Sequence, residues 1–409
     1  MLHSSRADRL LGCVAQPGWF QFDSSEPGNP WAFAGCDRPV LEMSCDARTF
    51  VTTLRNSEKV VRTWDDPLAA LAYLEADALA LPDRNGRWAG FLSYDLGRLF
   101  ENVPSFARDD FNGPLFRFSL ITPQFINFEM RSRSERRWSA KPLTSTLTRG
   151  QYVQAVARCV EYVRAGDIFQ VNLSQRFTTS VKRTAREIYQ RIQNDAPAAY
   201  AAVLDFGDLA LVSNSPELFL YVTPDRRVIT RPIKGTRPRE NGKDIELLNS
   251  EKDAAELNMI VDLERNDLGR VCEIGSVKVT QPRTIEAHPT VFHGVATVEG
   301  KLRPDVGFVD LLRATFPGGS ITGAPKVRAM EIIEELEPVR RGPYCGAIGY
   351  LAGDGSMQFN VAIRTMIMKD GLVHVPVGGG IVADSVPEEE YEETLVKARA
   401  MFAALGVTT

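Results

Sequence analysis

Residues 209–230 read LALVSNSPELFLYVTPDRRVIT and contain three short runs of apolar and β-branched side chains. Turn-forming residues interrupt these runs, so the pattern predicts strands at Leu209–Ser213, Leu218–Thr223 and Arg227–Thr230. Consecutive strands with few intervening helices favour antiparallel sheets. The stretch therefore indicates an α+β fold rather than a doubly wound parallel sheet.

The segments on both sides of this stretch fit the same fold class. Asn360–Met368 and Leu372–Val377 are predicted to form a hairpin around Lys369-Asp370-Gly371, because Asp-Gly is a favoured two-residue turn. Apolar residues at three- and four-residue steps predict helices at Tyr152–Ala165 and near residues 250–263, 324–337 and 385–404.

Composition excludes several classes of protein. The chain has 409 residues, 44% of them hydrophobic, and its net charge of −4 argues against a nucleic-acid binder. No apolar run approaches the roughly 18 residues of a membrane span, and Met1–Trp19 lacks the apolar core of a secretion signal. The six cysteines form no C-x-x-C pair, so we expect reduced thiols and a cytoplasmic location.

The last helix is expected to carry two faces. Ser385-Val386-Pro387-Glu388 fits a capping box and predicts its start. Glu390, Glu393 and Lys397 share one face, and two carboxylates one turn apart suit a magnesium ion with an anionic ligand. The same spacing also fits a solvated face with a Glu393–Lys397 pair. The apolar stripe that should face the core contains Tyr391, Leu395, Ala398, Phe402 and Leu405.

A second acidic helix is predicted near residues 250–263. Asp253 and Glu256 lie one turn apart, on the side that also carries Leu257 and Ile260. Carboxylates beside large apolar groups are costly unless they are paired or bind a metal. The alternative is an edge position from which they reach water. Two such helices in one chain favour a magnesium ion shared between them.

A glycine-rich segment, Phe316–Lys326, leads into the helix near residues 324–337. Free backbone N–H groups at such a helix start can bind anions. Gly318 and Gly323 have the spacing of a nucleotide-binding P-loop, but Ala324 stands where that motif requires lysine. A nucleotide site is therefore not expected, whereas a site for a carboxylate or hydroxyl group, or a purely structural turn, stays open.

Lys234 lies in an extended basic segment, Arg231–Arg239, that Pro232 and Pro238 prevent from forming a helix. Positive neighbours and burial both lower the pKa of a lysine and favour the neutral amine that a nucleophile needs. The three arginines of the segment are expected to contribute to this effect. A basic surface patch is the alternative.

Together, these segments resemble the chorismate-utilising enzyme family. The resemblance runs from about Gly166 to Leu405, and the region 146–409 is expected to bind chorismate and perform catalysis. Residues 1–145 match weakly, apart from Gly90–Glu101, and are expected to complete the fold. The implied architecture is two large antiparallel sheets packed as a β-sandwich and flanked by helices. The motifs that carry the resemblance are Gly166–Asn172, Ser215–Glu217, Pro232–Arg239, Asp262–Asp267, Gly318–Lys326, Ile363–Thr365 and Gly378–Ser385.

The resemblance implies a role for each candidate site residue. Glu256 and Glu393 would ligate Mg²⁺, with Asp253 and Glu390 beside them, and the ion would hold a chorismate carboxylate. Lys234 would be the covalent nucleophile and Glu217 the general acid and base. The substrate would be held by Gly235, Thr236, His293, Ser320, Tyr344, Arg364, Gly378, Gly379, Gly380 and Lys397.

Two positions indicate which reaction the chain performs. Family members that add water carry a lysine base where this chain has Gln170, so ammonia is the expected nucleophile. Anthranilate synthases carry alanine where Lys234 stands, whereas members that make 4-amino-4-deoxychorismate carry lysine. The expected reaction is therefore amination of chorismate to 4-amino-4-deoxychorismate, the precursor of 4-aminobenzoate and folate. Anthranilate synthesis is the alternative reaction.

The expected partners are chorismate and a separate glutamine amidotransferase subunit that supplies ammonia. None of the six cysteines lies in a glycine-rich nucleophile elbow, so the chain is not expected to hydrolyse glutamine itself. A chorismate sensor without activity is the competing class of protein. A sensor would need the residues that hold the substrate but neither Lys234 nor Glu217.

Overall fold

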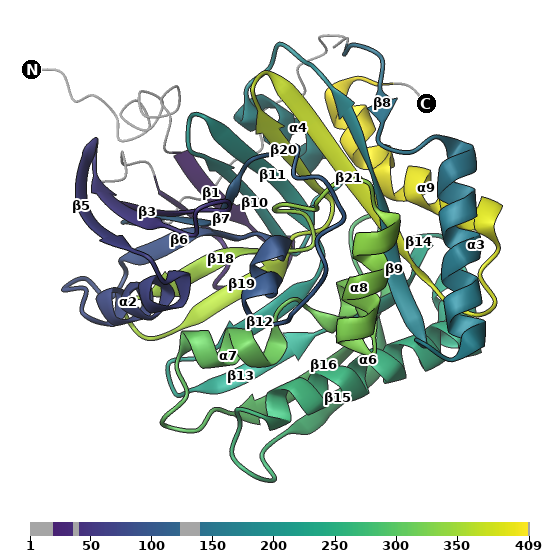
Figure 1. Cartoon of the computed structure of the whole chain (residues 1–409). Coiled ribbons are helices and arrows are strands. Elements are labelled where there is room, and N and C mark those ends of the chain that lie inside the picture. Colours follow the sequence, from purple (N-terminus) through teal and green to yellow (C-terminus); the bar gives the residue numbers. More distant parts are fainter. Residues whose placement is uncertain (1–18, 36–40, 123–139, 408–409) are drawn as a thin grey trace, which may run out of the picture.

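Two antiparallel sheets pack face to face, with helices on their outer faces (Figure 1). The computed structural model describes residues 19–35, 41–122 and 140–407. From edge to edge, the first sheet contains β17 (Gly323–Ala324), β9 (Gln170–Thr179), β21 (Leu372–Ile381), β20 (Thr365–Lys369), β11 (Leu209–Ser215), β10 (Tyr200–Asp205), β1 (Trp19–Asp23) and β2 (Phe33–Gly35), and β8 (Thr144–Ser145) also pairs with β9.

The second sheet is larger and includes most strands of the N-terminal region. From edge to edge it contains β14 (Ile233–Pro238), β16 (Val291–Lys301), β13 (Arg227–Arg231), β12 (Leu218–Val222), β19 (Met357–Val361), β18 (Ala347–Ala352), β6 (Arg87–Leu92), β7 (Pro114–Ile121), β3 (Leu41–Asp46), β4 (Thr52–Asn56) and β5 (Lys59–Trp64), and β15 (Lys278–Ala287) also pairs with β16. Strands from before and after residue 145 therefore lie in the same sheets.

Helices cover both outer faces of the sandwich. They are α2 (Pro67–Leu79), α3 (Arg149–Ala165), α4 (Ala185–Asp195), α5 (Lys243–Leu248), α6 (Glu251–Gly269), α7 (Phe308–Thr315), α8 (Lys326–Leu336) and α9 (Pro387–Leu405), with 3₁₀ turns η1 (Tyr94–Leu99) and η2 (Gly319–Ile321). In Figure 1, α3, α8 and α9 lie on the side of β9 and β21, whereas α2 and α7 lie against the second sheet.

The main apolar core lies between the two sheets. Phe22 from β1 packs on Tyr350 from β18, and Phe118 from β7 packs on Phe359 from β19. A second cluster joins α4 and α9 to the outer face of the first sheet. This arrangement confirms the predicted α+β sandwich.

The three consecutive strands predicted at 209–230 form, but they are divided between the sheets. β11 belongs to the first sheet, whereas β12 and β13 belong to the second. The chain changes sheet at Pro216–Glu217, so Glu217 lies where the two sheets meet. A second crossing separates β19 from β20, and the two crossings contact each other because the Val361 N–H donates to the Glu217 carbonyl at 3.0 Å.

The second crossing corrects one prediction. Asn360–Met368 was expected to be one strand, but it is interrupted between Val361 and Thr365, and Arg364 has a positive φ of 51°. Apolar residues on both sides of the break hide it from periodicity, because β19 and β20 are both buried. The hairpin of β20 and β21 forms with Asp370-Gly371 as its turn, as predicted.

Candidate active site

Glu217 lies at the meeting point of the sheets and is almost completely buried. Burial raises the pKa of its carboxyl from 4.5 to about 7, although the Ser320 hydroxyl, Lys234 and the Ile233 N–H each favour the charged form. Burial likewise raises the pKa of the neighbouring Glu264, which accepts a hydrogen bond from Thr230 at 3.0 Å. Glu217 can therefore exchange a proton near neutral pH, as a general acid and base must.

Lys234 projects from β14 toward the glycines of β21. A Cβ added to Gly380 would lie 3.4 Å from Lys234 Nζ. Burial lowers the pKa of Lys234, against the opposing effect of the nearby Glu256 and Glu217 carboxylates. A larger fraction of Lys234 is therefore the neutral amine than in an exposed lysine.

The predicted influence of the neighbouring arginines on Lys234 is wrong. Arg231 pairs with Glu286, Arg237 pairs with Glu246 and Asp253, and Arg239 donates to the His288 carbonyl. Arg231 ends β13, Arg239 follows β14, and Arg237 lies in the strand of Lys234 but three residues away, so it points to the opposite face. Burial is the main cause of the lowered pKa of Lys234, and the positive charge that adds to it comes from Lys397 rather than from these arginines.

Glu256 and Glu393 approach the site from α6 and α9. Each acts electrostatically on the other and on Lys234, so the two helices present carboxylates to one space. Burial raises the pKa of Glu256, whereas Lys397 overcomes burial and lowers the pKa of Glu393. Lys397 Nζ lies 2.6 Å from Glu393 Oε1.

The other two predicted metal residues already have partners in the protein. Arg237 contacts Asp253 at 3.1 Å, and the Ser385 hydroxyl donates to Glu390 at 2.6 Å. The predicted capping box at Ser385 is therefore wrong, because α9 begins after Val386 without a side-chain cap. The four carboxylates do not converge as a preformed cluster, but Mg²⁺ commonly uses only one or two carboxylates together with substrate and water. Glu256 and Glu393 fit that requirement.

Glycines make room for the site. A Cβ on Gly379 would lie 3.3 Å from Glu390 and 3.4 Å from Lys397. Gly235 has a φ of +79°, and a Cβ there would lie 2.8 Å from the Asp253 carboxyl carbon. A side chain at either position would crowd these charged groups, so the backbone itself forms this wall of the site.

The predicted substrate-binding side chains lie around these glycines. Lys397 Nζ donates to the Gly378 carbonyl at 3.1 Å, and Arg364 donates to the Lys397 carbonyl at 3.0 Å. The buried Tyr344 acts electrostatically on Arg364 and is therefore near it. These residues join β20, β21 and α9 at one end of the sandwich.

Thr236 and His293 face each other across β14 and β16. Thr236 Oγ1 and His293 Nδ1 are hydrogen-bonded at 2.9 Å. Burial lowers the pKa of His293 to about 3, so its ring is neutral at physiological pH. Neutral histidine carries one N–H, so this ring can offer a hydrogen bond to a ligand without adding charge.

The structure gives Gln170 more importance than the sequence indicated. Its side chain is fully buried, and neither atom of its amide has a hydrogen-bond partner among the described residues. A Cβ on Gly380 would lie 2.7 Å from Gln170 Nε2 and 3.4 Å from Lys234 Nζ. Buried amides are rarely left unpaired, so the pair flanks a space suited to a polar ligand. Its place in the motif Gly166–Asn172 was the available signal.

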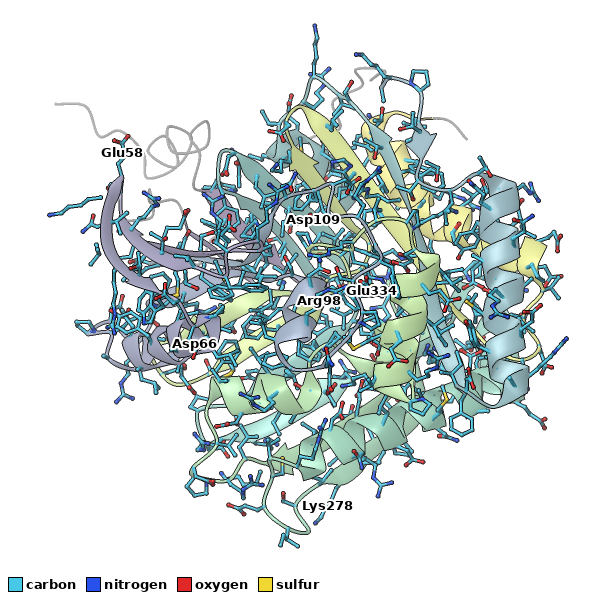
Figure 2. The ribbon with its side chains drawn as sticks, viewed as in Figure 1. Glu58, Asp66, Arg98, Asp109, Lys278 and Glu334 are labelled. Carbon is cyan, nitrogen blue, oxygen red and sulfur yellow. The ribbon has the colours of Figure 1, made fainter. Side chains whose placement is uncertain are left out.

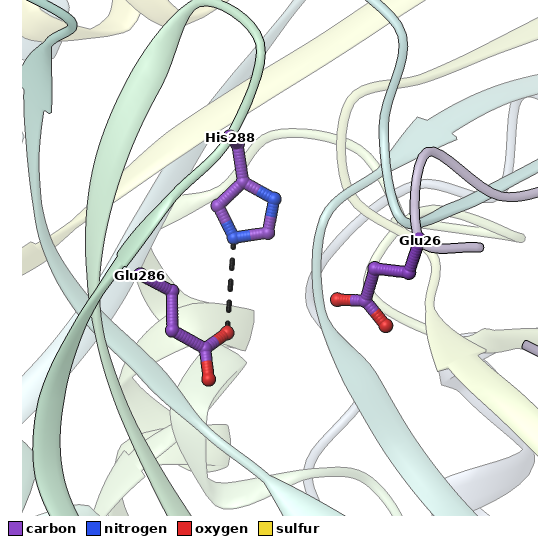
Figure 3. Close-up of side chains that lie close together, drawn as sticks. All are labelled: Glu26, Glu286 and His288. Carbon is purple, nitrogen blue, oxygen red and sulfur yellow. Dashed lines mark ion pairs between the residues drawn. The ribbon is translucent and has the colours of Figure 1, made fainter.

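A separate acidic cluster lies behind the site. Glu26, Glu286 and His288 lie close together (Figure 3), and their ligand atoms are within 4.8 Å of one another. Arg231 contacts both carboxylates, including Glu26 at 3.7 Å. Both carboxylates of this cluster already have a guanidinium partner, so the cluster does not need a metal ion.

In the described part of the chain, no helix is both long and apolar enough to cross a bilayer. The four cysteines in that part are buried and unpaired, as expected for small apolar side chains: Cys45, Cys159, Cys272 and Cys345. Cys13 and Cys36 lie outside the described residues.

Comparison with known proteins identifies a family for the chain. Residues 42–403 match the family described as chorismate binding enzyme. Anthranilate synthase component 1 of Thermus thermophilus is 41% identical over 83% of this chain and 82% of its own length. Aminodeoxychorismate synthase component 1 of Escherichia coli is 39% identical over 90% of this chain and 89% of its own length.

A solved structure confirms the architecture. Anthranilate synthase component I from Streptococcus pneumoniae superposes with a TM-score of 0.77 at 31% identity, covering 95% of this chain and 93% of that one. The match extends well before residue 145, so the N-terminal region is part of the shared fold. The chain belongs to the family of chorismate-binding enzymes.

Proposed function

We propose that this enzyme aminates chorismate with ammonia to give 4-amino-4-deoxychorismate, the precursor of 4-aminobenzoate and folate. The observation that carries the proposal is the pairing of Lys234 with Glu217. The pKa of the amine is lowered and that of the carboxyl is raised to about 7, both by burial. A neutral amine beside a protonated acid is the combination that nucleophilic displacement of a hydroxyl group requires.

In the first step, the neutral Lys234 amine attacks C2 of the chorismate ring. Both ring double bonds shift toward C4, and the C4 hydroxyl leaves as water after Glu217 gives it a proton. The substrate is then joined to Lys234 through a C–N bond, and Glu217 is ionised. The nearby positive charge on the substituted amine stabilises that carboxylate.

In the second step, ammonia attacks C4, both ring double bonds shift back, and the C2–N bond breaks so that the Lys234 amine leaves. Glu217 takes a proton from the new ammonium group and returns to its starting form. Gln170 supports ammonia as the nucleophile, because its unpaired amide oxygen can accept an N–H bond. An amide cannot deprotonate water, which supports the expectation that water is not the nucleophile.

Magnesium is proposed to be held by Glu256 and Glu393, with Asp253 and Glu390 beside them. When bound, the ion would supply positive charge for a substrate carboxylate. Lys397 and Arg364 would add cationic groups for the anionic substrate, and neutral His293 with Thr236 would add hydrogen bonds. Tyr344, Ser320 and the backbone at Gly235 and Gly378–Gly380 complete the proposed substrate site.

Anthranilate synthesis is the second candidate, since several relatives of comparable similarity carry that name. Lys234 favours the first candidate. In anthranilate synthesis ammonia adds at C2 directly, and the chain would need no covalent amine there. A lysine at that place would also fill space that the direct route leaves to ammonia.

A separate glutamine amidotransferase is proposed as the source of ammonia. Glutamine hydrolysis of that type needs an accessible cysteine nucleophile. The four cysteines in the described regions are buried, and burial raises the pKa of their thiols, which disfavours the reactive thiolate. The purified chain should therefore use ammonium salts but not glutamine.

Product identification tests this function. Chorismate, ammonium and magnesium should yield a product that an aminodeoxychorismate lyase converts to 4-aminobenzoate. Direct formation of anthranilate, detected by its fluorescence without the lyase, would contradict the proposal and support the second candidate. Omission of ammonium should abolish turnover.

A further inference from the structure

Strand β9 has a gap in its neighbours at the edge of the first sheet. β17 pairs with β9 as far as Val171, and β8 pairs with it from Phe177 onward. Within the gap, Arg341 Nη2 donates to the Asn172 carbonyl at 2.6 Å, and the Ser174 N–H donates to Glu337 Oε1 at 2.8 Å. The side chains of Arg341 and Glu337 thus form hydrogen bonds with the backbone of β9 where no strand pairs with it.

The Arg341–Glu337 pair is buried and bidentate. Its side chains are 2% and 4% exposed, and the two N–O distances are 3.0 and 2.7 Å. Desolvation offsets most of the attraction in a buried ion pair, so a well-packed neutral pair is often equally stable. A gain in stability therefore does not explain why two charged side chains lie here. The specific hydrogen bonds that they form are the better explanation.

The bonds of Arg341 lead to elements that carry proposed site residues. Arg341 Nη1 donates to the Ile321 carbonyl at 2.9 Å, and the preceding residue, Ser320, hydrogen-bonds to Glu217. The Arg341 carbonyl accepts from the Tyr344 N–H at 3.3 Å. The bond to Asn172 fixes β9 two residues after Gln170.

Glu337 completes this arrangement from the opposite side. It holds Ser174, which pairs with Gly378 in the glycine segment of β21. One ion pair thus connects the Ser320 turn, the Gln170 strand, the glycine wall and Tyr344. No other group in the described residues makes all of these connections.

We propose that Arg341 and Glu337 are positioning residues, which align Ser320, Gln170 and Tyr344 for the reaction without touching the substrate. This inference rests on the proposed site but not on the identity of its product. Displacement of reacting groups by about 1 Å can reduce a rate about 100-fold. Loss of the Arg341 bonds should therefore lower kcat much more than it raises the KM for chorismate.

The chain offers a matched control on the same helix. Arg98 of η1 and Glu334 of α8 form another partly buried ion pair, and Figure 2 shows their side chains close together. Glu334 accepts from the N–H groups of Phe106 and Ala107, which carry no proposed site residue. The control pair supports the fold in a similar way, and its connection toward the site is only indirect, through Asp95 and the Gly342 N–H.

The experiment compares the double variants R341M/E337Q and R98M/E334Q with the single variant R341M. Glutamine at either acidic position still accepts backbone N–H bonds. R341M/E337Q leaves no partner of the pair charged and alone, and in R98M/E334Q the buried Asp95 keeps Arg340 nearby and the Gly342 N–H bond. Both double variants should melt at higher temperature than R341M, which leaves Glu337 charged and alone. Chorismate consumption is measured, so the result does not depend on which amine is produced.

We expect R341M/E337Q to lose about 100-fold in kcat at a similar KM, while R98M/E334Q stays within about threefold of the unsubstituted enzyme. The pKa seen in the pH profile of R341M/E337Q should also rise, because the Ser320 bond that favours ionised Glu217 is loosened. If R341M/E337Q had both a higher melting temperature than R341M and the kcat of the unsubstituted enzyme, the proposal would be overturned. The ion pair would then have only a structural role. If the proposed reaction were wrong, a different product would be found. The comparison of variants measures only chorismate consumption and is independent of that result.

Discussion

Two cations three residues apart in the chain meet carboxylates in opposite ways. Arg231 lies between Glu286 and Glu26 and forms an ion pair with each. Burial alone would lower the pKa of Arg231, but Tyr200 and Glu286 raise it, so the group stays charged. Lys234 lies near Glu256 and Glu217, and its pKa is lowered by burial.

The two clusters differ in whether their cation can lose its proton and whether their carboxylates are free to bind a ligand. A guanidinium is permanently charged and forms fixed bonds to carboxylates, whereas a buried ammonium group can lose its proton. The Arg231 cluster is therefore internally satisfied. The Lys234 cluster keeps an amine whose pKa is lowered by burial, an acid with a pKa near 7 and carboxylates that can bind a cation. Acidic groups close together do not alone identify a reactive site; the nature of the neighbouring cation matters more.

The largest expected loss of activity comes from replacing Lys234 with arginine, which makes its cluster resemble that of Arg231. Lys234→Arg keeps positive charge but removes the group that can become neutral, so aminodeoxychorismate formation should fall by about 1,000-fold or more. Melting temperature should change little, because the positive charge near Glu256 and Glu217 is kept. Activity above one tenth of the original would show that Lys234 acts only through its charge.

Removal of a proposed metal ligand should have the next largest effect. Glu393→Ala should lower turnover at saturating magnesium by at least about 100-fold, because the substrate carboxylate loses its bound cation. Glu393 lies away from the buried stripe of α9, so the fold should persist. Glu286→Gln serves as the matched control and should keep its magnesium dependence. Full activity of the original enzyme in excess chelator would exclude a magnesium role.

The ionisation of Glu217 should affect the free energy of unfolding as well as the reaction rate. Its folded pKa is raised from 4.5 to about 7, so its ionisation opposes folding as pH rises through this window, by about 3 kcal/mol in total. Glu217→Gln removes this effect and should gain about 2.5 kcal/mol relative to the original protein between pH 5 and pH 8. Denaturant unfolding at both pH values measures the difference, and an equal effect at both would contradict the raised pKa.

The smallest effect is expected at Arg231. Arg231→Met leaves Glu26 and Glu286 without their cation, but both are partly exposed, so unfolding free energy should fall by only about 1 kcal/mol. Chorismate turnover should stay within about threefold, since this cluster lies outside the proposed chemistry. A loss comparable to that of Lys234→Arg would show that the two clusters act as one.

The sequence predicted the strands better than their assignment to sheets. Leu209–Ser213 and Leu218–Thr223 were recognisable from their apolar residues, but the crossing at Glu217 was not, because both strands are buried. The break before Arg364 was missed for the same reason. These crossings are what bring Glu217 and Arg364 to the site.

The sequence indicated which acidic helices lie near one another better than it indicated their interactions. The spacing of Asp253, Glu256, Glu390 and Glu393 identified two acidic helices, but their partners Arg237 and Ser385 depend on tertiary structure. The arginines around Lys234 were misjudged because their partners lie elsewhere in the fold: carboxylates for Arg231 and Arg237, and the His288 carbonyl for Arg239. Gln170 gave no chemical signal on its own, since an unpaired buried amide can be recognised only from the folded chain.

Mass spectrometry of the Lys234 peptide tests the central claim most directly. The enzyme is incubated with chorismate and magnesium without ammonia, quenched and digested. We predict that the peptide containing Lys234 gains the mass of chorismate minus water, and that added ammonium releases this group as 4-amino-4-deoxychorismate. Lys234→Ala should show neither adduct nor product. Absence of the adduct together with an undiminished rate of aminodeoxychorismate synthesis in Lys234→Ala would contradict the covalent mechanism.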